Sequence, residues 1–102
     1  MTDQSLTFTE ARQIDPITTL MGPLPARERD LRLKLHHAGN LASCMAYETE
    51  SPLARDLCWM VCELTTTWKF APAHVDTLER IAKLAKRLTI CANDALLFEA
   101  GV

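Results

Sequence analysis

The stretch from residue 52 to residue 70 reads PLARDLCWMVCELTTTWKF. Apolar residues recur in it at steps of three and four, the period of one buried helix face; they are Leu53, Leu57, Met60, Val61, Leu64 and Trp68. Cys58, Trp59 and Cys62 add apolar surface outside that face. A helix that is apolar on most sides is typical of a central position. We therefore predict that residues 52–70 form the middle helix, covered by the flanking helices and by a partner chain where these leave it open.

The composition fits a small helical protein. A chain of 102 residues forms one domain with a modest core, and 48% hydrophobic residues argue against disorder. Three glycines and 6% aromatic residues argue against an all-β sandwich or barrel, which needs many turns. The net charge of −2 supplies no overall attraction to nucleic acid or to an anionic membrane.

The sequence also indicates where the protein works. The N-terminus is polar and lacks the basic start and apolar run of a signal peptide. No apolar run approaches the roughly 20 residues of a membrane span. We therefore expect a cytoplasmic protein without membrane contact, whose four cysteines are reduced thiols.

Two further long helices flank the central stretch. The first is predicted over residues 25–48, where apolar and small residues alternate in steps of four and three: Leu31, Leu35, Ala38, Ala42 and Met45. The last is predicted to begin at Pro72 and to end between Asp94 and Phe98, with its stripe at Leu78, Ile81, Ala85, Leu88, Ala92 and Ala95. Short connections between long helices favour antiparallel neighbours. We interpret the charged run 27–34 as a solvated face.

Residues 1–24 are predicted to be an arm. Leu6 and Phe8 alternate with polar residues, which suggests a short extended segment. Asp15 followed by Pro16 is a helix start, and Gly22 is a helix stop. The expected fold is all-α: a three-helix antiparallel bundle or a helical hairpin over residues 25–102, with a partly irregular N-terminal arm over residues 1–24.

The cysteines and histidines are the first candidates for chemistry. Cys58 and Cys62 lie one helical turn apart, and further possible metal ligands are Cys44, Cys91, His36, His37 and His74. Zinc sites usually carry closely spaced pairs of ligands, whereas here one pair lies within a helix and the rest are single. Cys44 and His37 share a helix face, yet no strained nucleophile turn or glycine-rich loop accompanies them. We predict no enzyme activity, no metal site and no cofactor.

Nucleic-acid binding is a second candidate. Arg80, Lys83 and Arg87 share one face of the last helix, and a short turn over residues 71–73 precedes it. A helix-turn-helix would direct such residues toward phosphates. The turn lacks glycine, both helices are long and the chain is slightly acidic, which together disfavour direct nucleic-acid binding.

Protein binding is the remaining class. The central helix carries more apolar surface than one neighbouring helix covers, and tryptophan is over-represented at the energetic centres of interfaces. The residues that we predict to contact a partner are Phe8, Ile17, Leu20, Met21, Trp59, Cys62, Trp68 and Phe70. A homodimer would cover the same surplus, so self-association is also expected.

Two runs carry a resemblance: LHHAGNLASCMAY over residues 35–47 and LARDLCWMVCEL over residues 53–64. They resemble small helical-hairpin proteins of pseudomonads, and the size and character of the chain are similar to those of quorum-sensing anti-activators. That resemblance implies binding to the ligand-binding domain of a LuxR-type transcription factor and a block of its dimerisation or DNA binding. We therefore predict a small regulatory protein that covers the dimer or DNA-binding surface of a transcription factor. The alternatives are a small helix-turn-helix-like DNA-binding protein and a structural homodimer.

Overall fold

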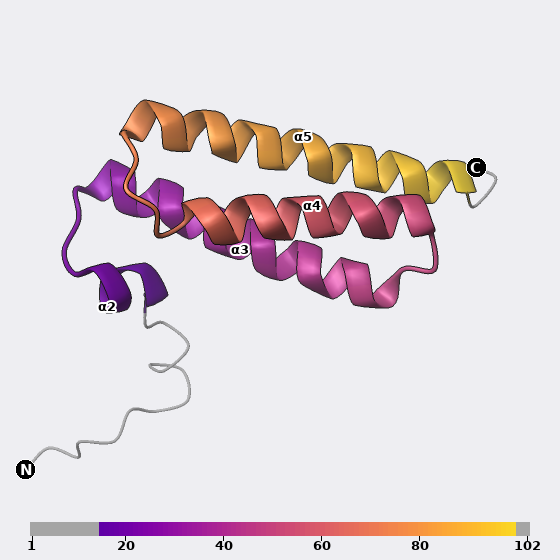
Figure 1. The fold of residues 1–102 in the computed structure, drawn as a ribbon, viewed down its shortest axis with the longest axis horizontal. Coiled ribbons are helices and arrows are strands. Elements are labelled where there is room, and N and C mark those ends of the chain that lie inside the picture. The colour runs from indigo at the N-terminus through magenta and orange to yellow at the C-terminus, as the bar shows by residue number, and fades with distance from the viewer. Residues whose placement is uncertain (1–14, 100–102) are drawn as a thin grey trace, which may run out of the picture.

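The computed structural model describes residues 15–99, and within that range the protein is all-α, as predicted. Its helices are α2 (Pro16–Met21), α3 (Ala26–Glu48), α4 (Pro52–Trp68) and α5 (Val75–Glu99). α4 contacts both α3 and α5, and consecutive long helices run in opposite directions (Figure 1). The expected extended segment around Leu6 and Phe8 lies outside the described residues.

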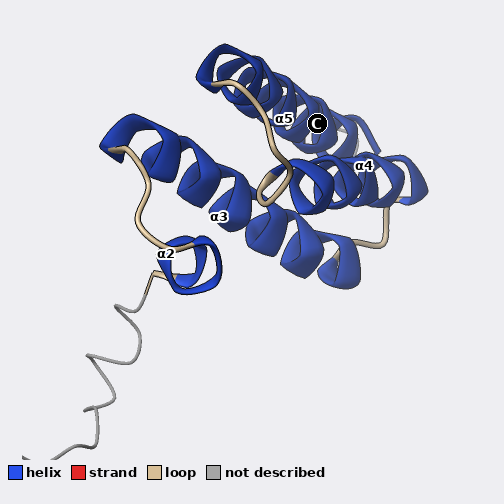
Figure 2. Ribbon diagram, turned by 60° about the vertical axis from the view of Figure 1, so that its left-hand side comes forward, coloured by secondary structure: helices blue, strands red, loops and turns tan. Residues whose placement is uncertain are grey.

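Local signals set the ends of α2 as predicted. The Asp15 carboxylate accepts hydrogen bonds from the backbone N–H groups of Ile17 (2.8 Å) and Thr18 (3.2 Å), which no intrahelical carbonyl can reach. Pro16 occupies the first helical position, where no backbone donor is needed. Gly22 ends the helix with φ of 80°, a conformation that favours glycine. α2 packs on α3, to one side of the three long helices (Figure 2).

Serine and histidine caps begin α4 and α5. Ser51 Oγ accepts a 3.1 Å hydrogen bond from the Ala54 backbone N–H, as the sequence predicts. The last helix begins at Val75 and not at Pro72, so its predicted start is wrong by one turn. The reason is that His74 caps it: His74 Nδ1 accepts from the Asp76 backbone N–H at 3.2 Å. At its other end α5 continues to Glu99, and so the apolar residues 96–98 extend the helix.

Small side chains occupy the centre of the helix packing. The main cluster of buried residues joins α3, α4 and α5 and consists of Ala42, Ala46, Cys58, Val61, Ala85 and Ala92. A second cluster, nearer the start of α3 and α5, consists of Leu31, Leu35 and Leu78. Short side chains let helix backbones approach closely, because little volume separates the helix axes.

The charged start of α3 is not entirely a solvated face, and for Arg32 that interpretation is wrong. The side chain of Arg32 is only 2% exposed. Its Nη1 donates to backbone oxygens at the end of α4 and just after it, those of Trp68 (3.3 Å), Lys69 (3.1 Å) and Ala71 (2.8 Å). Its Nε donates to Glu28 Oε2 at 3.1 Å. Arg32 therefore ties α3 to the connection between α4 and α5.

Candidate interaction surface

The structure does not gather the predicted contact residues of the N-terminal segment on one surface. Phe8 lies outside the described residues. Ile17 is fully buried, so its side chain anchors α2 within the chain and offers no surface to a partner. Leu20 is 69% exposed and Met21 is partly buried. α2 thus presents Leu20, but not Ile17, to another molecule.

Trp59 and Trp68 lie on opposite sides of α4. They are nine residues apart, which at about 100° per residue turns the helix by roughly half a circle. Trp59 packs against the main core cluster, with its ring at right angles to Tyr47 and the centroids 5.3 Å apart. Trp68 packs against the second cluster. Both rings are partly buried, so much of their apolar surface already stabilises the fold.

Cys62 and Phe70 are also partly buried. Cys62 lies at the crossing of α3 and α4, where its Sγ donates to the backbone oxygen of Gly39 at 3.6 Å. Phe70 lies beneath the Lys69 ammonium group, which is 5.3 Å from the ring centroid. These two residues consequently belong to different parts of the molecule.

The sulfur and imidazole groups do not assemble into a site among residues 15–99. No group of three or more His, Cys, Asp and Glu side chains in this range could hold a metal ion. Cys58 is buried, and burial raises the pKa of its thiol. Burial likewise raises the pKa of the Cys62 thiol. A raised pKa leaves less thiolate, the reactive form, near neutral pH.

His36 has an electrostatic environment that gives a testable pH dependence. Lys69 Nζ lies 3.3 Å from His36 Nδ1, and Asn40 Nδ2 lies 3.3 Å from His36 Nε2. Burial lowers the pKa of His36 below its ordinary value of 6.5, and the positive charge of Lys69 lowers it further. Because the folded pKa is the lower one, the contribution of neutral His36 to stability is complete above pH 6.5 and declines as the pH falls below it.

We therefore expect the His36 ring to titrate below pH 6.5 in the folded protein. Its pKa should rise in Lys69→Met, because that substitution removes the neighbouring positive charge. Imidazole chemical shifts followed by NMR across the acid range measure both values. A His36 pKa that is unchanged by Lys69→Met would contradict the contact between these two side chains.

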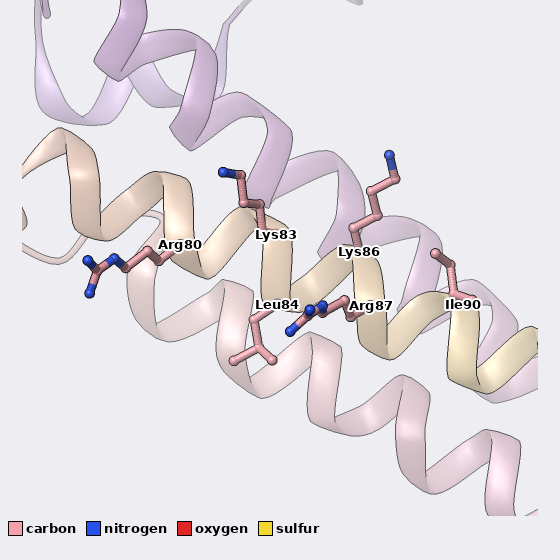
Figure 3. Close-up of a pocket in the computed structure, with 6 residues that line it drawn as sticks. All are labelled: Arg80, Lys83, Leu84, Lys86, Arg87 and Ile90. Carbon is pink, nitrogen blue, oxygen red and sulfur yellow. The ribbon is translucent and has the colours of Figure 1, made fainter.

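The sequence predicts that the cations Arg80, Lys83 and Arg87 share one face of the last helix, but the exposed apolar residues that lie among them were missed. We call this apolar and basic surface the α5 surface, and its residues are Arg80, Lys83, Leu84, Lys86, Arg87 and Ile90. Leu84 is 43% exposed and Ile90 is 50% exposed, each beside two or more cations. Figure 3 shows that Lys83, Lys86 and Ile90 point to the α3 side of α5, whereas Leu84 and Arg87 point to the α4 side.

The α3 side of this surface continues into a groove of about 500 Å³ between α3 and α5. We call it the α3–α5 groove; it is lined by Lys34, Leu35, Ala38, Leu41, Ala82, Ala85, Lys86, Thr89 and Ile90. Leu41 is 57% exposed at one of its walls. On the α4 side of α5, a second and shallower hollow lies between Met60 and Leu64 of α4 and Leu84 and Leu88 of α5.

The α5 surface is positive because the carboxylate beside it is already paired. Glu79 contacts Arg27 of α3 and lies 3.5 Å from Lys83 Nζ. The hydrogen bond and charge of Arg27, with a smaller effect of Lys83, hold the pKa of Glu79 below its ordinary value. Lys34 and Lys86 make no ion pair within residues 15–99. Their charges are therefore available to a ligand.

One signal in the sequence could have located this surface. Leu84 and Ile90 fall outside the stripe of core residues on the last helix, at positions where a solvated helix face usually carries polar side chains. Apolar residues off the stripe, interleaved with lysine and arginine, indicate a face that is not merely solvated.

Comparisons of the chain with protein-family models, with curated proteins and with solved structures found no match. Within residues 15–99, no helix combines the length and the apolar character needed to cross a membrane.

Proposed function

We propose that this protein acts by binding another protein through the α5 surface and the adjoining α3–α5 groove. The observation that carries the proposal is the exposure of Leu84 and Ile90 within a basic helix face. Covering apolar surface is favourable by roughly 25 cal/mol per Å². Lysines and arginines around such a patch steer an acidic partner toward it and select its orientation.

The resemblance to quorum-sensing anti-activators suggests the kind of partner. In that form of the proposal, the chain inhibits a LuxR-type transcription factor by covering its dimer or DNA-binding surface. The apolar side chains would supply affinity, and the cations would supply orientation. Trp59 and Trp68 would act indirectly, because their rings support the helices that present the α5 surface.

A reporter controlled by a LuxR-type factor of a pseudomonad tests this function. Co-expression of the wild-type chain is expected to lower the reporter signal. Leu84→Glu and Ile90→Glu should each abolish most of that repression, because a charge replaces an apolar contact at the centre of the surface. Leu20→Glu is the matched control: it alters an even more exposed apolar side chain on α2, away from α5, and should repress like the wild type.

Circular dichroism melts of the three variants keep folding separate from binding, since exposed substitutions should change stability little. Full repression by both α5 variants would contradict the α5 surface as the binding site. Loss of repression in Leu20→Glu alone would indicate that the binding site is on α2. A reporter unaffected by the wild-type chain would contradict the anti-activator form.

DNA binding is a second candidate function, supported by Arg80, Lys83, Lys86 and Arg87 on α5. Exposed Leu84 and Ile90 lie among these cations, and apolar side chains gain nothing beside phosphates. A gel-shift assay with duplex DNA, performed at several salt concentrations, separates the two functions. A complex whose affinity falls steeply with salt would support the DNA-binding form.

A structural homodimer is the remaining proposal from the sequence. Exposed apolar side chains occur away from the α5 surface, at Tyr47, Leu53, Leu97 and Phe98. Self-association over these residues would leave the α5 surface free for another protein. Sedimentation equilibrium of the purified chain measures the oligomeric state.

A further inference from the structure

We propose that the α3–α5 groove binds an acidic amphipathic helix of the partner protein. This inference rests on the proposed function and specifies the chemistry of the partner. The shape, the length and the charge of the groove support it.

The floor of the groove suits the apolar face of a helix. Ala85 is buried there, and Ala38 and Ala82 are partly buried, so the floor consists of methyl groups. Leu41 and Ile90 rise as exposed walls near one end. A floor of small residues between larger apolar walls leaves room for the apolar side chains of a helix from the partner protein, which is the helix-in-groove mode of recognition.

The length of the groove matches about three helical turns. A second hollow continues it toward the start of both helices and adds Leu31 and Glu79 to the lining. From Leu31 to Leu41 the helix rises about 15 Å, since each residue adds about 1.5 Å. A bound helix of that length presents apolar residues at positions i, i+3 or i+4, and i+7.

The charge of the groove selects an acidic helix. Lys34 lies on the α3 side, and Lys83 and Lys86 lie on the α5 side, so cations flank the floor on both helices. Glu79, the one carboxylate among the lining residues described, is paired with Arg27 and Lys83. Glutamate or aspartate on the flanks of a bound helix would meet Lys34 and Lys86.

Charge argues against a second copy of this chain as the occupant of the groove, and shape argues against duplex DNA. A second copy of this chain, placed groove to groove, would bring the same lysines face to face and repel itself. Duplex DNA would leave Leu41 and Ile90 exposed, because a groove between two helices of one domain is too narrow for a duplex.

Fluorescence anisotropy with two designed peptides tests the inference. Both are stapled helices of about 16 residues with leucine at the i, i+3 or i+4, and i+7 positions. One carries glutamate on its flanks, and the matched control carries lysine at the same positions. The full-length chain is expected to bind the glutamate peptide at least about tenfold more tightly than the lysine peptide, and more weakly as salt increases.

Variants of the chain then locate the site. Lys34→Glu and Lys86→Glu should each weaken binding of the glutamate peptide about tenfold. Arg55→Glu makes the same change in charge at an exposed position of α4, outside both the α5 surface and the α3–α5 groove, and should weaken it less than about threefold. Matching thermal melts confirm that the variants are folded.

Several outcomes would overturn the inference: no binding of the glutamate peptide at about 200 µM, equal binding of the two peptides, or an equal effect of all three charge reversals. Preferential binding of a control DNA duplex over the glutamate peptide would also overturn it and favour the DNA-binding form. If the peptide results contradict the inference but Leu84→Glu still abolishes repression, the proposed function is supported and the partner contacts the surface by something other than an acidic helix. Groove-dependent peptide binding without reporter repression would instead overturn only the anti-activator form.

Discussion

Arg32→Met is expected to lower the free energy of unfolding by about 3 kcal/mol, because it removes the cation that the end of α4 depends on. The last carbonyls of a helix have no intrahelical partner. Here the backbone oxygens of Trp68, Lys69 and Ala71 accept hydrogen bonds from Arg32 Nη1 in a buried setting. Methionine fills a similar volume but donates nothing, so these oxygens and the Glu28 carboxylate lose their partner.

Urea denaturation followed by circular dichroism measures this loss. Arg29→Met is the matched control, since Arg29 lies one turn earlier on α3 with 45% of its side chain exposed. Its effect should stay within about 0.5 kcal/mol. If Arg32→Met proved as stable as Arg29→Met, the hydrogen bonds of Arg32 would contribute little to stability and the ordering of residues 69–74 would need another cause.

Gly39→Ala is expected to destabilise the fold by about 1 to 2 kcal/mol, although alanine is the better helix former by about 1 kcal/mol. A Cβ atom at this position would lie 2.5 Å from Thr65 Oγ1 of α4. Thr65 is buried, and its hydroxyl donates to the Val61 backbone oxygen at 2.8 Å, so it cannot simply turn toward solvent. The crossing of α3 and α4 would have to widen.

In a Thr65→Ala background, Gly39→Ala is expected to change the free energy of unfolding in the opposite direction. In Thr65→Ala the obstructing hydroxyl is gone, so Gly39→Ala should become neutral or stabilising by up to about 1 kcal/mol. Thermal or urea denaturation of the four proteins gives the coupling energy between the two positions. Additive effects of the two substitutions would contradict the close approach of Gly39 and Thr65.

Local sequence signals predicted the helices well. The pairs Asp15–Pro16 and Ser51–Pro52 each combine a cap with a proline, and both mark true helix starts. The start of α5 was misplaced because a histidine cap is an uncommon signal, whereas Pro72 is a strong one. The core stripes were visible because a period of three and four residues places side chains on one helix face irrespective of neighbours.

The candidate site could not be predicted in the same way. The frequency of tryptophan in interfaces predicts Trp59 and Trp68 as contact residues, yet both pack against the core of the chain itself. Conversely, Leu41 and Ile90 are not close in sequence, and only the packing of α3 beside α5 brings them to one groove. In the sequence Arg32 resembles the other charged residues of its run, because its burial depends on the connection after α4, whose backbone oxygens it contacts.

The sequence by itself determined the all-α class and the caps that begin α2 and α4, because these depend on interactions within a few residues. Only the tertiary structure decided which apolar side chains remain exposed, which arginine is buried and where the groove lies. Burial depends on the distance and rotation between helices that are far apart in the chain, and helical periodicity specifies the face of each helix but not the neighbour that covers it.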